Sequence, residues 1–301
     1  MTDRLIKALA FDGQVRVFVL DAKQTVQEAK ERHQTWHTAT AALGRSLAAT
    51  ALLAANLKGQ ERVSVEVIGS GPLGRIVTDG DSQGNVRGFV NNPKVALELN
   101  SQGKLDVAGA VGLPGSLVVR KHMGSGEPFA GQVPLVSGEL AEDFTYYMAV
   151  SEQTPSAIGL SVLVNADESV AAAGGFMLQM MPGADDLLVD LLEARIKELG
   201  RFSDLLESQK TLEELLDLLV GPGNAQVLEE IPVSFHCPCD KERFAKGIRS
   251  IGKEEIQAMI DEDHGAEVVC HFCGDRFTFS EDELSQLVAE IDQQRTEASE
   301  E

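Results

Sequence analysis

The chain has 301 residues, of which 43% are hydrophobic, and a formal net charge of −21 at pH 7. This hydrophobic fraction is sufficient for a folded core, so the composition excludes wholesale disorder. No run of about 20 apolar residues predicts a membrane-spanning helix, and the N-terminal residues lack the apolar core of a signal peptide. We therefore expect a soluble, cytoplasmic protein without a membrane partner.

The acidic side chains are concentrated in the C-terminal part. Residues 1–180 carry 18 acidic and 15 basic side chains, whereas residues 181–301 carry 29 acidic and 11 basic ones, a net charge of −18. Nucleic-acid binding depends on cationic groups that displace counterions from the phosphates. The charge therefore argues against DNA or RNA as a partner.

Residues 1–182 are predicted to form an α+β domain with a mainly antiparallel sheet, because strand and helix patterns are interspersed. The expected helices cover residues 24–33, 38–57 and 139–151. The expected strands cover residues 62–67, 75–78 and 86–90, followed by a hairpin of residues 158–164 and 169–177.

Two sequence features invite a cofactor or catalytic interpretation. Gly69-Ser-Gly-Pro-Leu-Gly74 matches the dinucleotide fingerprint, but the helix that this motif must open is missing, so we interpret it as a tight turn. A polar and aromatic cluster follows the first helix, and we interpret it as surface or packing residues. Its members are Arg32, His33, Trp36 and His37. We therefore expect a protein that is not an enzyme.

The pattern changes at Pro182-Gly183. Residues 183–231 are predicted to be an acidic, Leu-rich helical linker, with Thr211 and Glu214 in the spacing of a capping box. The apolar faces of these helices need a partner surface, and their polar faces are densely negative. Such a segment should be only marginally stable.

Residues 232–301 are predicted to form a small C-terminal domain. Short strands precede each cysteine pair, helices are expected near 241–250 and 253–262, and Ser280 and Glu283 have capping-box spacing for a last helix. About 70 residues with few large apolar side chains cannot easily build a stable core alone. We therefore expect this domain to depend on a metal ion.

All four cysteines of the chain lie in this domain, as Cys237-Pro-Cys239 and Cys270-His-Phe-Cys273. Two thiol pairs separated by such a loop are typical of a four-thiolate zinc site. The sequence therefore predicts one Zn²⁺ per chain in the reduced state, with all four cysteines as ligands. We interpret the adjacent His236 and His271 as neighbours of the site.

A zinc site of this kind can be a static structural clip or a redox switch. Zinc keeps its ligands as thiolates, which are also the form that oxidants attack. Cys270 and Cys273 have a spacing that closes readily into a disulfide, and Cys237 and Cys239 would also pair through a small, strained ring. Oxidation to two disulfides would remove the metal ligands and unfold the domain.

The cysteine pattern closely resembles that of the redox-regulated 33-kDa chaperonin family, bacterial heat-shock holdases. The similarity includes the blocks Phe235–Arg243 and Val269–Gly274, and more weakly Gly69–Gly74, Phe144–Gln153 and Ala173–Met177. It therefore spans nearly the whole chain.

The resemblance implies an ATP-independent chaperone that is inactive while reduced and zinc-bound. On oxidation, Cys237 would pair with Cys239 and Cys270 with Cys273, zinc would be lost, and the linker and zinc domain would unfold. The active form would be a homodimer that binds unfolding client proteins under oxidative and heat stress. No motif indicates which residues bind clients.

Two other interpretations stay open on the sequence alone. One is an enzyme whose zinc module is purely structural, although no catalytic constellation is evident. The other is a thiol-disulfide oxidoreductase that uses Cys270 and Cys273, although a thioredoxin-like pattern around them is lacking.

Overall fold

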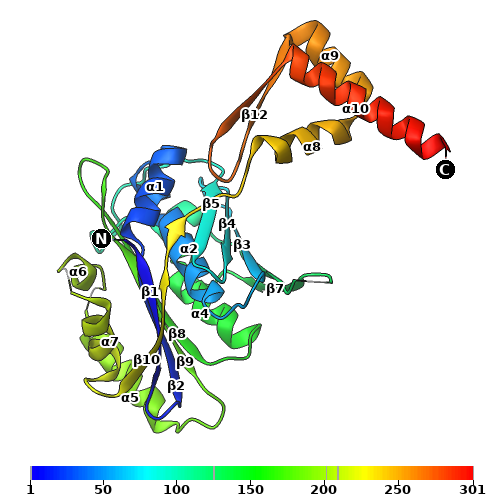
Figure 1. Cartoon of the computed structure of the whole chain (residues 1–301). Coiled ribbons are helices and arrows are strands. Elements are labelled where there is room, and N and C mark those ends of the chain that lie inside the picture. The colour runs from blue at the N-terminus through cyan, green and yellow to red at the C-terminus, as the bar shows by residue number, and fades with distance from the viewer. Residues whose placement is uncertain (1, 125, 201, 209, 301) are drawn as a thin grey trace. The chain divides into compact units, whose positions relative to one another are not determined.

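A computed structural model describes residues 2–124, 126–200, 202–208 and 210–300. The chain divides into two compact units, Met1–His236 and Cys237–Glu301. Figure 1 shows two sheets with surrounding helices in the first unit, and helices with one hairpin in the second. No helix among the described residues is both long enough and apolar enough to cross a membrane.

The first unit contains a five-stranded and a six-stranded sheet. The five-stranded sheet has the order β10-β1-β2-β9-β8, from β1 (Arg4–Ala10), β2 (Val15–Asp21), β8 (Ser156–Val164), β9 (Val170–Met180) and β10 (Ala225–Pro232). The six-stranded sheet has the order β11-β5-β4-β3-β6-β7, from β3 (Arg62–Ile68), β4 (Arg75–Asp81), β5 (Asn85–Val90), β6 (Ser116–His122), β7 (Phe129–Pro134) and β11 (Ser234–Phe235). Among the described strands, only β5 and β11 pair in parallel. The predicted α+β class with mainly antiparallel sheets is confirmed.

Helix α2 (His37–Ala54) forms the core between the two sheets. It contacts β4 and β5 of one sheet and β8 and β9 of the other, and all its residues except His37 and Arg45 are buried. A helix that is apolar all round belongs in an interior, and its many Ala and Thr side chains allow close approach. The other helices of this part are α1 (Lys23–His33), α3 (Val107–Val111) and α4 (Ala141–Val150).

The glycine-rich motif at 69–74 connects β3 to β4, and no helix follows it. A Cβ atom on Gly71 would lie 2.4 Å from the carbonyl oxygen of Ala110, and Gly74 has a φ of +72°. The glycines therefore serve a close backbone approach and a left-handed turn position, which confirms the tight turn.

The linker helices α5 (Leu187–Glu198), α6 (Phe202–Glu207) and α7 (Leu212–Val220) pack on the five-stranded sheet. The predicted capping box is confirmed: the Thr211 N–H donates to Glu214 Oε2 at 2.8 Å, and the Glu214 N–H donates to Thr211 Oγ1 at 3.2 Å. The apolar stripe of α7 packs with apolar side chains of β1, β2 and β9. The buried members from α7 are Leu212, Leu215, Leu216, Leu219 and Val220.

One part of the linker is not helical. Residues 225–232 form β10, which pairs with β1 over its whole length. The local sequence, with its Leu and two Glu residues, gives no alternating strand pattern. The open edge of β1 supplies unpaired backbone groups, and this tertiary partner determines the strand.

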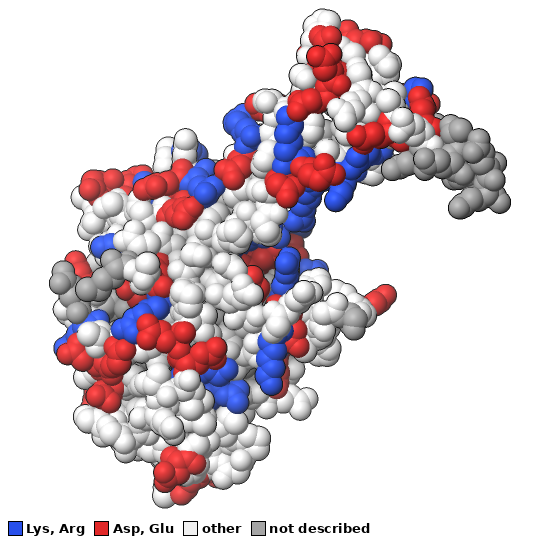
Figure 2. All heavy atoms as spheres, in the orientation of Figure 1, with Lys and Arg blue, Asp and Glu red and all other residues white. Residues whose placement is uncertain are grey.

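The C-terminal unit contains α8 (Lys241–Ile251), α9 (Lys253–Asp263), the hairpin of β12 (Gly265–Val269) and β13 (Arg276–Ser280), and α10 (Glu281–Glu300). The helices agree with those expected, and the Ser280–Glu283 capping box is present, with N–H to oxygen distances of 2.9 and 3.3 Å. The core is small. Its buried members are Ala245, Ile248, Ile256, Phe279, Leu284 and Leu287. Figure 2 shows Asp and Glu side chains over the helices of this unit and over the linker helices.

Candidate metal centre

The first cysteine pair lies between a strand and a helix. Strand β11 ends at Phe235, two residues before Cys237, and Cys239 immediately precedes Asp240, the N-cap of α8. The Asp240 carboxylate accepts a hydrogen bond of 2.7 Å from the Arg243 N–H. Because an N-cap fixes the first turn of a helix, Cys239 is held at a defined place beside α8.

The second cysteine pair lies in the turn between β12 and β13. The Cys270 N–H donates to the Asp275 carbonyl at 2.9 Å, and the Gly274 N–H donates to the Cys270 carbonyl at 2.7 Å. Gly274 has a φ of +77°, which favours glycine. These bonds fold Cys270–Asp275 into a knuckle that turns Cys270 and Cys273 to the same side.

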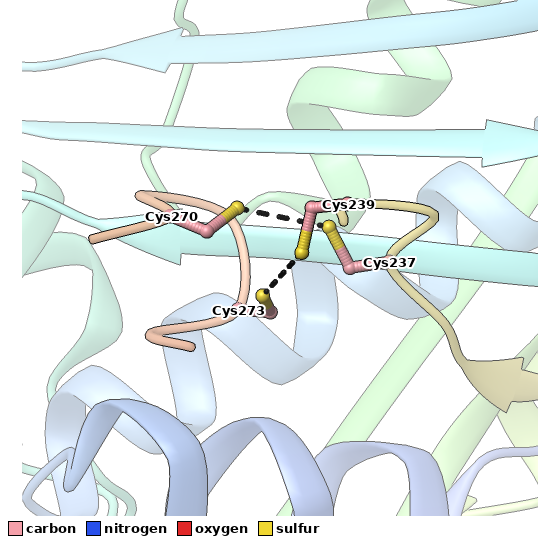
Figure 3. Close-up of side chains that lie close together, drawn as sticks. All are labelled: Cys237, Cys239, Cys270 and Cys273. Carbon is pink, nitrogen blue, oxygen red and sulfur yellow. Dashed lines mark hydrogen bonds between the residues drawn. The ribbon is translucent and has the colours of Figure 1, made fainter. Parts of the chain in front are cut away.

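The four sulfur atoms form one cluster in which every sulfur lies within 4.8 Å of the others. Figure 3 shows the two pairs facing each other, with Cys237 Sγ 3.8 Å from Cys270 Sγ and Cys239 Sγ 3.3 Å from Cys273 Sγ. A disulfide has a sulfur–sulfur distance of about 2.05 Å, and all four cysteines are free thiols. The structure thus brings together all four residues that the sequence singled out.

The cluster has the dimensions of a tetrahedral metal site. Zinc–sulfur bonds of about 2.3 Å in tetrahedral geometry place sulfurs about 3.8 Å apart. The Cys237–Cys270 contact of 3.8 Å equals this value, and the Cys239–Cys273 contact of 3.3 Å is 0.5 Å shorter. Cys270 and Cys273 are buried, while Cys237 and Cys239 are partly exposed. The four cysteines could therefore hold one metal ion.

Burial changes the acidity of two of these thiols. Desolvation by burial raises the pKa of Cys239 from 9.0 to about 11, and burial likewise raises the pKa of Cys273. A buried thiolate without a cation is unfavourable. Without a metal, Cys239 and Cys273 therefore carry neutral thiols at pH 7, and metal binding has to release the protons of these two groups.

The histidines beside the cysteines lie outside the sulfur cluster. His236 and His271 are exposed, and neither belongs to the group of potential metal ligands among the described residues. This agrees with their interpretation as neighbours of the site.

Of the polar and aromatic cluster, Arg32 and His33 at the end of α1 pack against Phe235, whereas Trp36 is exposed and His37 Nδ1 lies 3.6 Å from Glu168. His33 stacks edge-on against Phe235 with ring centroids 6.4 Å apart, and the Arg32 guanidinium lies 5.5 Å from the centre of the same ring. Phe235 itself is buried. The sequence did not indicate this contact, because Phe235 is about 200 residues away in the chain.

Known proteins match this sequence over nearly the whole chain. A family model described as "Hsp33 protein" matches residues 3–280. The chain is 52% identical over 287 residues to a 33 kDa chaperonin of Enterococcus faecalis, covering 95% of this chain and 96% of the relative. It is also 52% identical over 291 residues to a 33 kDa chaperonin of Latilactobacillus sakei, covering 96% of this chain and the full length of the relative.

A solved structure gives the same answer for the fold. The crystal structure of the 33 kDa chaperonin, a heat shock protein 33 homologue, of Thermotoga maritima matches with a TM-score of 0.90 and 38% identity. The match covers 96% of this chain and 98% of that one. The chain therefore belongs to the Hsp33 family, a family of chaperones that are not enzymes.

Proposed function

We propose that Cys237, Cys239, Cys270 and Cys273 bind one Zn²⁺ in the reduced protein. Four thiolates are the donor set of structural zinc sites, and the sulfur–sulfur distances fit the ion. When bound, zinc keeps the four sulfurs deprotonated and links the start of the C-terminal unit to the turn between β12 and β13, in a unit whose own core is small.

Metal retention should depend steeply on pH. Because burial raises the pKa of the Cys239 and Cys273 thiols, protons compete with the metal for these sulfurs, and the apparent metal affinity falls as the pH falls. We expect the reduced protein to retain zinc at about pH 8 and to release it to a chromogenic chelator at about pH 5.5. Equal retention at both values would contradict thiolate ligation.

The activity proposed is that of a redox-regulated, ATP-independent holdase for unfolding proteins under oxidative and heat stress. The observation that supports the proposal is the cluster of four free thiols, which brings the start of a small unit together with the turn between β12 and β13. In the reduced state, α5, α6 and α7 cover the five-stranded sheet, β10 occupies its edge, and the chaperone is inactive. In the oxidised state, the linker and residues 232–301 unfold, whereas residues 1–182 stay folded.

Each activating step is a two-electron oxidation. Two thiols and one molecule of hydrogen peroxide give one disulfide and two molecules of water, so two peroxide molecules oxidise the whole site. We propose the pairs Cys237–Cys239 and Cys270–Cys273. The site then has no thiolates left and loses its metal. A zinc site contributes on the order of 10–16 kcal/mol to the folding of such a module, which is comparable to or larger than the typical domain stability of about 5–15 kcal/mol.

The chain connects the site directly to the region that has to open. Cys237 follows β11, whose Ser234 and Phe235 pair with β5, and β11 follows β10 at the edge of the other sheet. Loss of order at Cys237 therefore removes support from the end of the linker.

The partners that we propose are unfolded client proteins and a second copy of the chain, which forms the active homodimer. We place the protein in the cytoplasm, where thiols stay reduced.

One experiment tests the proposal. Reduced, zinc-loaded protein is treated with peroxide under mild heat, and zinc release, helicity and the aggregation of a heat-denatured client are followed together. We expect all three to change in parallel, with client aggregation suppressed only after oxidation. Zinc that stays bound, or client protection that is equal before and after peroxide, would contradict the switch. Catalytic turnover of a disulfide substrate would instead indicate an oxidoreductase.

A further inference from the structure

One segment covers the edges of both sheets in the N-terminal unit. We call residues 224–236, which include β10 and β11, the strap. It pairs with β1 along the five-stranded sheet and with β5 along the six-stranded sheet. The Ser234 N–H donates to the Gly84 carbonyl at 3.1 Å, and the His236 N–H donates to the Val86 carbonyl at 2.9 Å. Without the strap, β1 and β5 would be open edges with unpaired backbone groups.

The strap is held mainly by its backbone. Of the eight residues of β10, only Ile231 is buried, and Val227 and Leu228 are 46% and 49% exposed. Side-chain burial therefore contributes little to this pairing, whereas β10 pairs with β1 from Arg4 to Ala10, with one bulge at Leu228 where the register shifts between Lys7 and Ala8. Such pairing tolerates many sequences, because main-chain hydrogen bonds supply the affinity.

Two backbone hydrogen bonds, one at each end of β1, show which backbone groups of β1 face the strap. The Asp3 carbonyl accepts from the Val233 N–H at 3.0 Å, and the Phe11 N–H donates to the Asn224 carbonyl at 3.0 Å. Backbone groups alternate between the two edges of a strand. The odd-numbered residues of β1 therefore face the strap, and they are Leu5, Lys7 and Leu9.

Side chains beside this edge define the kind of strand that it accepts. Ile6, Ala8 and Ala10 belong to the apolar face that α5 and α7 cover. Two cations of β1 pair with acids of the strap: Arg4 with Glu230 at 3.0 Å and Lys7 with Glu229 at 3.8 Å. Arg4 also pairs with Glu213 of α7 at 3.0 Å. A complementary strand therefore has alternating apolar side chains and carries acidic rather than basic residues.

We propose that the edge of β1 binds an extended client segment as an added antiparallel strand once the strap has detached. The inference rests on the proposed function, because the strap has to leave first. The client then replaces β10 on the backbone of Leu5, Lys7 and Leu9 and covers the neighbouring apolar face. The strap thus acts as an internal placeholder for the client.

Amide hydrogen exchange of the full chain tests this proposal. In the reduced protein, the amides of Leu5, Lys7 and Leu9 are protected by the strap; after oxidation their exchange should accelerate, and client binding should slow it again by about tenfold or more. Amides of the central strand β3 serve as the control and should change little. Client held without renewed protection of β1 would overturn the proposal and leave the holdase function intact.

Two further outcomes are distinct from this one. If oxidation neither exposes β1 nor produces client holding, the proposed function and this inference both fail. If protection of β1 returns without client and increases with protein concentration, a second copy occupies the edge, and the client proposal is overturned.

A synthetic peptide of residues 224–236 gives a matched comparison. It should restore protection of β1 in the oxidised chain and compete with a client. The Glu229→Pro peptide should lose both effects, because position 229 pairs with Lys7 and its N–H faces β1. The Glu230→Pro peptide changes a residue whose N–H faces away from β1. It should therefore largely retain both the protection of β1 and the competition with a client. Equal behaviour of the two variants would contradict strand addition.

Discussion

Replacing Cys239 with serine should unfold the C-terminal unit and abolish metal binding. Cys239 Sγ lies 3.3 Å from Cys273 Sγ, inside the cluster of four sulfurs. A hydroxyl is a poor zinc ligand, and a structural zinc contributes on the order of 10–16 kcal/mol to folding, in a unit whose own core is small. We expect the zinc content to fall from about one per chain to near zero. Loss of helical signal and rapid proteolysis after residue 236 should accompany it.

The matched control for this variant is His236→Ala. His236 adjoins Cys237 and is exposed, but it lies outside the sulfur cluster. This variant should keep its zinc and its protease resistance. A Cys239→Ser protein that lacks metal yet still resists protease would show that the apolar core alone stabilises the unit.

Replacing Leu219 with serine in the linker should make the chaperone active without oxidation. Leu219 is fully buried between α7 and the five-stranded sheet. Replacing a buried leucine with a small side chain costs about 2–5 kcal/mol, and the hydroxyl adds an unfavourable buried polar group. Because we expect the acidic linker to be only marginally stable, α7 should leave the sheet. We expect suppression of client aggregation without any peroxide, while the zinc stays bound.

The control lies one residue away on the same helix. Leu218 is 37% exposed, so Leu218→Ala should change stability by no more than about 0.5 kcal/mol. Its chaperone activity should stay dependent on oxidation. If Leu219→Ser also required peroxide, coverage of the sheet by α7 would not be what keeps the chaperone inactive.

The sequence predicted the features that depend on local patterns. The capping boxes at Thr211 and Ser280 formed as expected, because their side chains act within one helical turn. The cysteine cluster was also predictable, since thiol pairs at this spacing have few other structural uses. Its cysteines lie beside two locally determined features, the N-cap of α8 and the turn between β12 and β13.

Features that depend on distant partners were not predictable in the same way. Strand β10 has no alternating pattern, and it forms because the edge of β1, more than 200 residues earlier, supplies its hydrogen bonds. Strands β1 and β2 were likewise not identified, although they form the centre of the five-stranded sheet. The contact of Phe235 with His33 and Arg32 has the same cause.

Two sulfur contacts run between the two cysteine pairs, from Cys237 to Cys270 and from Cys239 to Cys273. Any link along these contacts closes a loop that contains residues 240–269. In chain-entropy terms, a loop of this size restricts the unfolded chain by about 3–4 kcal/mol.

The proposed disulfides close only the tiny loops within each pair and leave those thirty residues unconstrained. Which of the four sulfurs are paired with each other therefore decides whether residues 240–269 stay tethered or are released. Disulfide mapping by mass spectrometry after oxidation determines this pairing directly. A protein with disulfides between the two cysteine pairs would be oxidised, and yet residues 240–269 would still be constrained.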